Sequence, residues 1–211
     1  MTDAAPYQFT TDWFDIYARR IWPDLLARLQ PARVLEIGSY EGAAVCFLIE
    51  QSAAQPSIEI HCVDTWGGGI EHQSAGVDMA AVEARFLHNV NAAVAGARHT
   101  VDVRVHKQRS DLALAQLLTQ RGPGSFDFIY VDGSHQAADV LCDAVLAFRL
   151  LRVGGVLAFD DYLWAEDLPQ GRDPLRCPKP AIDAFVNLHF PKLDILRLPV
   201  AYQLYVQKRS D

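Results

Sequence analysis

The chain has 211 residues, half of them hydrophobic, so it can bury one substantial core, and we expect a single domain. Its formal net charge of −7 and the lack of any basic run argue against a nucleic-acid partner. No apolar run is long enough to cross a bilayer, and residues 1–6 show no signal-peptide pattern, so we expect no contact with a membrane.

The cysteines lie far apart in the sequence and form no C-x-x-C pair, although three of them sit in apolar stretches. This spacing argues against a zinc site and favours reduced thiols in a cytoplasmic protein. The residues concerned are Cys46, Cys62, Cys142 and Cys177.

Residues 7–29 carry apolar side chains at helical spacing, and Thr10 or Thr11 can cap the start. We expect one helix here that packs on the edge of the sheet. The alternative is that three aromatic residues of this segment cover a cofactor pocket: Tyr7, Phe9 and Trp13.

Residues 33–37 predict a buried parallel strand that runs into a tight turn and then a helix over residues 43–49. Gly38 allows the backbone to turn sharply and to approach a ligand closely. A strand, a glycine turn and a helix in this order are typical of a nucleotide pocket.

The spacing of the glycines distinguishes between cofactors. A dinucleotide fingerprint reads G-x-G-x-x-G, and its second glycine lets the backbone approach the pyrophosphate. Tyr40 occupies that position here, and Glu36 adds a carboxylate that would repel a phosphate and attract an ammonium group. The ligand that fits is a nucleoside with an amino-acid tail and no phosphate, S-adenosylmethionine.

The segment Glu36-Ile37-Gly38-Ser39-Tyr40-Glu41-Gly42 resembles motif I of the class I S-adenosylmethionine-dependent methyltransferases. The resemblance implies that four residues of this segment bind the cofactor: Glu36, Gly38, Ser39 and Gly42. The alternative is an ordinary strand-to-helix turn with two convenient glycines.

Residues 58–64 predict the second strand, which ends in Asp64, about 20 residues past the glycines. An acid at this point accepts hydrogen bonds from ribose hydroxyls, and a solvated strand-end aspartate is the alternative. The glycine-rich loop 65–76 follows, and we expect Thr65 and Trp66 to contact the cofactor. The Trp66 ring would stack on the adenine or line the substrate site. His72 is expected to be solvated, and the alternative is that it faces the substrate.

The next elements predicted are a helix over 77–94, a strand over 101–105 and a helix capped at residues 110–111. In the family that this chain resembles, the turn after the third strand commonly reaches the adenine. Ser110 is therefore a candidate adenine contact, although helix capping would explain this serine equally well.

Two further strands each end in acidic residues. Residues 126–131 predict a strand that is followed by Asp132, and residues 156–159 predict one that is followed by Asp160 and Asp161. Because neighbouring parallel strands lie about 5 Å apart, these carboxylates would converge and repel one another unless a cation intervened. Oxygen ligands alone favour Mg²⁺ over Zn²⁺.

These acids resemble the metal site of the catechol O-methyltransferase group, and the Asp-Gly-Ser-His and Asp-Asp-Tyr elements look more like related bacterial enzymes that methylate sugars and natural products. The resemblance covers roughly residues 30–165. It implies that Asp132, Asp160 and Asp161 bind Mg²⁺ and that Asp132 also borders the cofactor. His135 would be the general base, with Asp132 as the second catalytic residue. Plain turns and a helix start are the alternatives.

The last segments predicted are a Pro-rich loop over 165–180, a helix over 181–189, and strands over 193–197 and 201–206. The expected fold is α/β and Rossmann-like, of the class I methyltransferase type. It has a mostly parallel seven-stranded sheet, helices on both faces and a C-terminal antiparallel strand pair. Residues 1–30 would form a helical cap, 31–165 the cofactor-binding core and 166–211 the remainder.

The sequence thus predicts Mg²⁺-dependent O-methylation of a small-molecule hydroxyl, on a sugar, diol or natural product, and the family suggests a possible homodimer. Three alternatives stay open. They are a metal-independent methyltransferase, a nicotinamide-dependent oxidoreductase, and a non-catalytic S-adenosylmethionine-binding module.

Overall fold

The strands form one sheet in the order β3-β2-β1-β4-β5-β7-β6 in a computed structural model that describes residues 7–211. The expectation about a signal peptide falls on residues 1–6 and lies outside the described residues. The strands are β1 (Arg33–Ile37), β2 (Ser57–Asp64), β3 (Thr100–Lys107), β4 (Phe126–Val131), β5 (Leu151–Phe159), β6 (Leu193–Ile195) and β7 (Leu204–Lys208).

Strands β1 to β5 pair in parallel, and β7 is antiparallel to both β5 and β6. The expected mostly parallel seven-stranded sheet with a C-terminal antiparallel pair is confirmed. The strand order reverses between β1 and β4, which is where ligands bind in open α/β sheets.

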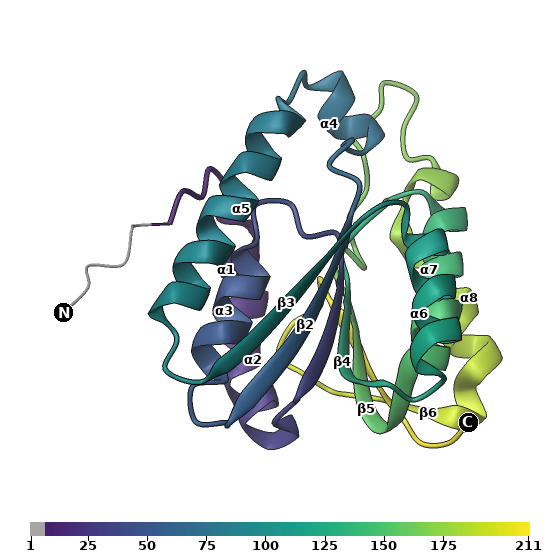
Figure 1. The fold of residues 1–211 in the computed structure, drawn as a ribbon. Coiled ribbons are helices and arrows are strands. Elements are labelled where there is room, and N and C mark those ends of the chain that lie inside the picture. The colour runs from purple at the N-terminus through teal and green to yellow at the C-terminus, as the bar shows by residue number, and fades with distance from the viewer. Residues whose placement is uncertain (1–6) are drawn as a thin grey trace.

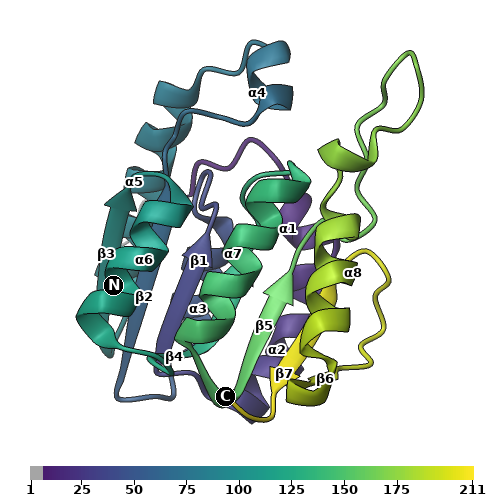
Figure 2. The same ribbon diagram turned by 90° about the vertical axis from the view of Figure 1, so that its right-hand side faces the viewer.

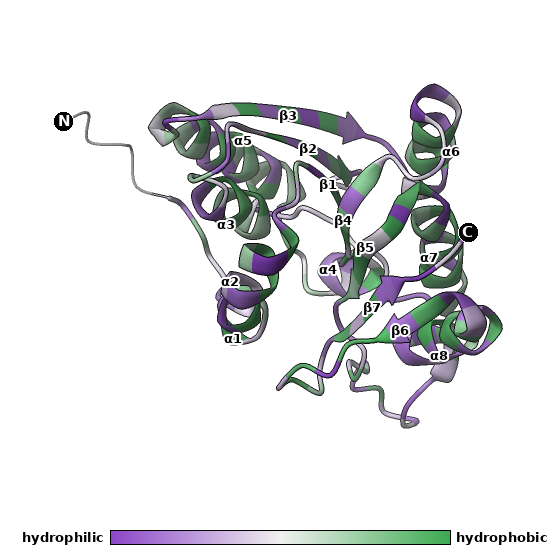
Figure 3. Cartoon of the chain, turned by 90° about the horizontal axis from the view of Figure 1, so that it is seen from below, coloured by the Kyte–Doolittle hydropathy of each residue, from purple (hydrophilic) through white to green (hydrophobic). Residues whose placement is uncertain are grey.

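Helices cover both faces of the sheet (Figure 1). One face packs on α1 (Trp13–Ile16), α2 (Ala18–Leu29), α3 (Ala43–Gln51) and α5 (Met79–Gly96). The other face packs on α6 (Ser110–Arg121), α7 (Ala137–Leu150) and α8 (Pro178–His189). The view along the sheet in Figure 3 separates the two helical layers.

Burial follows from the alternation of side chains along each strand. Val34 of β1 points into one buried cluster and Leu35 into the other. The central strand β4 is buried throughout, whereas the edge strand β3 alternates between exposed and half-buried residues. The continuous apolar run of β4 is therefore explained by the central position of this strand in the sheet.

The N-terminal segment differs from the single helix expected over residues 7–29. Residues 7–12 are not helical, and the helix is broken at Tyr17, whose backbone leaves helical geometry while its ring stacks on Tyr202 at 4.8 Å. Neither Thr10 nor Thr11 caps it. Thr10 instead donates from its backbone N and its Oγ1 to the buried Glu41 carboxylate, at 2.7 and 2.6 Å.

Other boundaries also differ. The glycine-rich loop contains a short helix, α4 (Ile70–Ser74), and Arg109 rather than Ser110 is the N-cap residue of α6. The Pro-rich segment contains a 3₁₀ turn, η1 (Pro174–Arg176), a second such turn, η2 (Phe190–Lys192), follows α8, and the last two strands are shifted or shortened. Within residues 7–211, no helix is both long and apolar enough to cross a membrane.

Two segments stand beyond the carboxyl ends of the strands. Figure 2 shows α4 and the yellow-green segment after β5 on either side of this edge. The residues that end β1, β2, β4 and β5 are the ones that the sequence assigned to the site.

Candidate functional site

The turn after β1 depends on Gly38. Its φ is +87°, and a β-carbon at this position would lie 2.0 Å from the backbone oxygen of Asp132. Tyr40 and Gly42 also have positive φ, of 45° and 81°. The turn therefore packs directly against the backbone that follows β4, which brings motif I and the acidic residues to one place.

Glu36 is a buried acid in this turn, with only 1% of its surface exposed. The Ser39 hydroxyl donates to its Oε2 at 2.5 Å. Burial raises the pKa of Glu36 to about 8, and the nearby Asp64 contributes to the rise. Among the described residues, no cationic side chain pairs with this carboxyl group.

Asp64 organises the same turn from the end of β2. Its Oδ2 accepts hydrogen bonds from the backbone N–H groups of Ser39 at 2.9 Å and Tyr40 at 3.0 Å. Its Oδ1 accepts one from the backbone of Trp66 at 2.7 Å. The carboxylate thus has a clear role in shaping the loop, and ribose binding by Asp64 stays a prediction.

Trp66 follows β2 and belongs to the buried cluster that also contains Phe86. Its side chain is buried, with 6% exposed, and packs on Phe86 with the ring centroids 4.8 Å apart. Its Nε1 donates a hydrogen bond to the backbone oxygen of Tyr40 at 3.0 Å. The ring therefore supports the motif I turn from the core side, and its contact with the cofactor or the substrate stays a prediction. Thr65 accepts from Gly67 N at 3.0 Å and is exposed.

Ser110 is the first residue of α6 and lies beside Asp143 of α7. Burial raises the pKa of Asp143 to about 7, while a hydrogen bond from Ser110 opposes the rise. The serine therefore already has a buried partner, and its contact with adenine stays a prediction.

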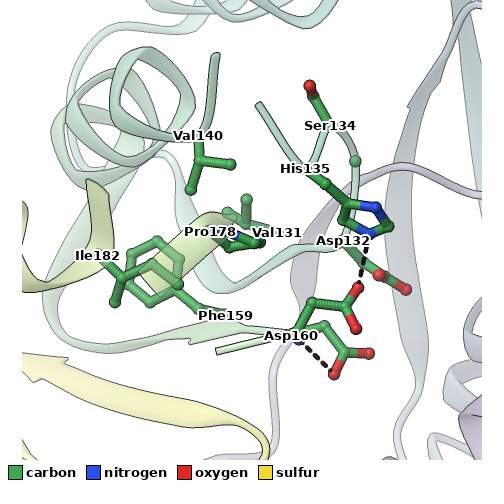
Figure 4. Close-up of a pocket in the computed structure, with 11 residues that line it drawn as sticks. Val131, Asp132, Ser134, His135, Val140, Phe159, Asp160, Pro178 and Ile182 are labelled. Atoms are coloured by element: carbon green, nitrogen blue, oxygen red, sulfur yellow. Dashed lines mark hydrogen bonds and ion pairs between the residues drawn. The ribbon is translucent and has the colours of Figure 1, made fainter. Parts of the chain in front are cut away.

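The acidic residues converge as expected at the ends of β4 and β5, where Val131 pairs with Phe159 (Figure 4). Burial raises the pKa of Asp132 well above its usual range, and the negative charges of Asp160 and Asp161 add to the effect. Burial and Asp161 likewise raise the pKa of Asp160. The opposite wall of this pocket is apolar and includes Val140, Phe159, Pro178 and Ile182.

Asp160 has partners that the sequence did not reveal. The Tyr130 hydroxyl donates to its Oδ2, and Gln203 Nε2 donates to its Oδ1 at 2.8 Å. Tyr130 lies within β4, and its hydroxyl reaches across to the next strand. Gln203 comes from the turn before β7, more than 40 residues from Asp160, and no local pattern in the sequence indicates the contact.

His135 is held between two carboxylates. Its Nε2 lies 2.9 Å from Asp161 Oδ2, and its Nδ1 lies 3.2 Å from Oε1 of Glu71 on α4. Burial lowers the pKa of His135, but hydrogen bonds to Asp161 and Glu71 outweigh this and raise it to about 9. In this arrangement the imidazole is protonated at neutral pH.

The side chains of the expected metal site are not arranged around a common point at which an ion could bind. Across residues 7–211, no group of three or more His, Cys, Asp or Glu side chains is arranged to hold an ion. The donor chemistry nevertheless fits a hard cation, because Asp132, Asp160 and Asp161 offer only oxygen, and the charges of Asp160 and Asp161 add to the raised pKa of Asp132. Two of them are turned to protein partners instead.

Comparison with protein families finds one match. A family described as a methyltransferase domain (Methyltransf_24) matches residues 35–162, which run from within β1 to the acids that follow β5. A comparison with curated proteins finds no match.

Solved structures share the fold at low sequence identity. The O-methyltransferase TomG of Streptomyces achromogenes, in complex with S-adenosylmethionine, is 16% identical, with a TM-score of 0.63 over 89% of this chain and 78% of that one. The S-adenosylhomocysteine-bound methyltransferase PaMTH1 of Podospora anserina is 22% identical, with a TM-score of 0.54 over 89% and 76%. An O-methyltransferase of Bacillus cereus with S-adenosylhomocysteine is 16% identical, with a TM-score of 0.58 over 98% and 85%.

Proposed function

The chain belongs to the family of methyltransferase domains, and on that premise we propose that it transfers a methyl group from S-adenosylmethionine to a hydroxyl group of a small molecule. The cofactor would lie across the ends of β1 and β2, next to the acidic residues. The ligands of the Streptomyces achromogenes and Bacillus cereus O-methyltransferases support this choice of cofactor.

One observation carries the proposal, namely the environment of Glu36. This carboxyl group is buried at the turn after β1, and its pKa is raised to about 8 because burial penalises the charged form. An ammonium group bound beside it would restore the charged form. The methionine part of the cofactor carries an ammonium group, whereas a nicotinamide dinucleotide would bring a pyrophosphate to the same turn.

We propose that Mg²⁺ binds to Asp132, Asp160 and Asp161. When bound, the ion would polarise the acceptor hydroxyl and lower its pKa. We propose that Asp161, whose Oδ2 lies 2.9 Å from Nε2 of His135, leaves this nitrogen when it turns to the ion. The same movement exposes the nitrogen that would take the hydroxyl proton, so the two requirements are met by one rearrangement.

His135 would then act as the general base. With Asp161 withdrawn, one of the two interactions that raise its pKa is removed, and the value falls toward neutrality. A base with a pKa near the working pH is the most effective. His135→Ala should therefore abolish turnover while cofactor binding persists.

Calorimetric binding tests the proposed function. We would titrate S-adenosylhomocysteine and, separately, NAD⁺ into chelator-treated protein. Binding of the homocysteine compound alone is the expected result. Binding of NAD⁺ alone would overturn the cofactor assignment, and binding of neither would remove the enzyme proposal.

A metal-independent methyltransferase is the second candidate, and the partners of Asp160 favour it. Both oxygens of this carboxylate already accept hydrogen bonds, from Tyr130, Gln203 and the backbone of Asp161. A Mg²⁺ titration distinguishes the two candidates. Asp132→Asn should abolish a Mg²⁺ signal, whereas Asp143→Asn, which changes another buried acid, should leave it unchanged. Absence of any Mg²⁺ signal in the wild type would favour the metal-independent candidate.

A further inference from the structure

Glu71 joins the short helix α4 to His135, and the proposed reaction gives it no role so far. Its Oε1 lies 3.2 Å from Nδ1 of the histidine, on the side of the ring opposite Asp161. Only 22% of the Glu71 side chain and 14% of the His135 side chain are exposed. The pair is therefore largely shielded from water, which strengthens an interaction between charges.

The backbone before Glu71 is shaped to leave room for this carboxylate. A β-carbon on Gly69 would lie 2.2 Å from Glu71 Oε1, although the backbone of Gly69 is extended and tolerates other residues. Gly69 N also donates to His72 Nδ1 at 3.1 Å, and the His72 ring stacks on Tyr40 at 5.5 Å. Helix α4 is thus fixed to the motif I turn on one side and to His135 on the other.

A second contact fixes the plane of the histidine ring. Trp164, which follows β5, stacks on His135 with the centroids 3.9 Å apart and an angle of 29° between the rings. A stacked ring can still flip by half a turn, which exchanges the positions of Nδ1 and Cδ2 and those of Nε2 and Cε1. The carboxylate of Glu71 at Nδ1 selects one of the two orientations.

We propose that Glu71 is a positioning residue that holds His135 through Nδ1, so that Nε2 is the nitrogen facing the acceptor hydroxyl. The hydrogen bond made by one ring nitrogen decides which nitrogen is free to accept a proton. Asp161 can leave Nε2 without disturbing the contact at Nδ1, because the two carboxylates lie on different elements. The inference rests on the proposed function, since it gives Nε2 the role of proton acceptor.

The test is an NMR measurement on protein labelled with ¹⁵N at histidine. The signal sought is the proton on Nδ1 of His135, assigned by its loss in His135→Gln. We expect it to be protected from water exchange in the wild type, where the Glu71 carboxylate lies 3.2 Å from Nδ1, and in Glu71→Gln, whose amide oxygen can take the same place. It should be lost to exchange in Glu71→Ala.

Two further variants make the test specific. Gly69→Ala should weaken the same signal, because the added β-carbon displaces the Glu71 carboxylate while the backbone tolerates the change. Glu166→Ala should not affect it. This control removes an acid with a similar exposed fraction, 20%, that pairs with Arg176 at 2.5 Å in the segment after β5. An unchanged signal in Glu71→Ala would overturn the inference.

Calorimetry with S-adenosylhomocysteine on the same variants separates this inference from the proposed function. Glu71→Ala should bind the compound as the wild type does, because Glu71 is assigned to the histidine and not to the cofactor. If the wild type bound no S-adenosylhomocysteine, the proposed function would fail whatever the NMR signal showed. If the wild type bound it and the Nδ1 signal did not respond to Glu71→Ala, only the positioning role would fail.

Discussion

The backbone oxygen of Asp132 occupies the space in which Gly38 would carry a β-carbon, 2.0 Å from that position. The motif I turn and the loop after β4 are therefore packed backbone to backbone. Gly38 N also donates to Val63 O at 2.8 Å, and Asp132 N donates to Ile37 O at 2.8 Å. This contact fixes the distance between the proposed cofactor site and the acidic residues.

Gly38→Ala should therefore destabilise the fold strongly. The left-handed backbone costs an alanine about 1–2 kcal/mol, and the contact with Asp132 adds a backbone clash that no side-chain movement relieves. Gly76→Ala is the matched control, since Gly76 has a φ of +67° and nothing within 4 Å of an added β-carbon. Denaturant unfolding should show a loss near 1–2 kcal/mol for Gly76→Ala and a clearly larger one for Gly38→Ala. Equal losses would contradict the packing argument.

Glu36 should make stability fall as the pH rises. Its pKa is raised from 4.5 to about 8 in the folded protein, mainly by burial. Below about pH 4.5 both folded and unfolded states hold the proton; between that value and about pH 8 only the folded state does, so the unfolded state is favoured progressively. Glu36→Gln removes this effect. The free energy of unfolding of the variant minus that of the wild type should therefore increase by a few kcal/mol between pH 4.5 and pH 8.

Glu59 provides the control for that measurement, because its pKa is shifted the other way. Burial raises the pKa of Glu59, but hydrogen bonds from Arg121 and His61 outweigh this and lower it to about 2. Its contribution to stability is complete above pH 4.5 and is lost as the pH falls toward 2. The difference between Glu59→Gln and wild type should therefore stay constant between pH 5 and pH 8. If the difference in free energy of unfolding from the wild type changed with pH in the same way for Glu36→Gln and Glu59→Gln, Glu36 would not be the cause of the change.

Cofactor binding should release a proton at neutral pH. Glu36 holds its proton at pH 7 because its pKa is about 8, and the ammonium group of the bound ligand would favour the ionised form. Calorimetry of S-adenosylhomocysteine in buffers of different ionisation enthalpy measures this release. The apparent enthalpy should depend on the buffer for the wild type and much less for Glu36→Gln. A wild-type enthalpy independent of the buffer would place the ammonium group away from Glu36.

A chain of hydrogen bonds connects the core to the acidic residues. Trp22 Nε1 donates to the Tyr205 hydroxyl at 3.0 Å, which donates to Gln203 Oε1 at 2.6 Å, and Gln203 then donates to Asp160 at 2.8 Å. Tyr205→Phe leaves a buried donor and a buried acceptor without partners, so it should cost about 1–3 kcal/mol in unfolding experiments. In the double variant with Trp22→Phe, the loss of free energy of unfolding should be smaller than the sum of the losses in the two single variants. Full additivity would show that the two side chains act independently.

The sheet could be predicted from the sequence because its strands are buried on both faces. Continuous apolar runs such as residues 126–131 have few alternatives to a central parallel strand, and the acids that follow them then fall on one edge. The expected convergence of Asp132, Asp160 and Asp161 followed from strand order alone. The topology therefore carries most of the information about where the site lies.

The parts that could not be predicted depend on contacts between distant residues. Trp66 reads as a loop residue, but its hydrogen bond to Tyr40 O and its contact with Phe86 place the ring in the core. The break at Tyr17 depends on a stacking partner almost 200 residues later, Tyr202. Glu71 reaches His135 only because α4 forms within a segment whose composition suggests a loop.

A crystal structure of the protein with S-adenosylhomocysteine is the most direct test of the proposed cofactor site. We predict that the amino group of the ligand lies against the Glu36 carboxylate and that the nucleoside crosses the ends of β1 and β2. The sulfur should then face the pocket formed by Asp132 and His135. A ligand bound elsewhere, or one whose amino group lies away from Glu36, would contradict the account.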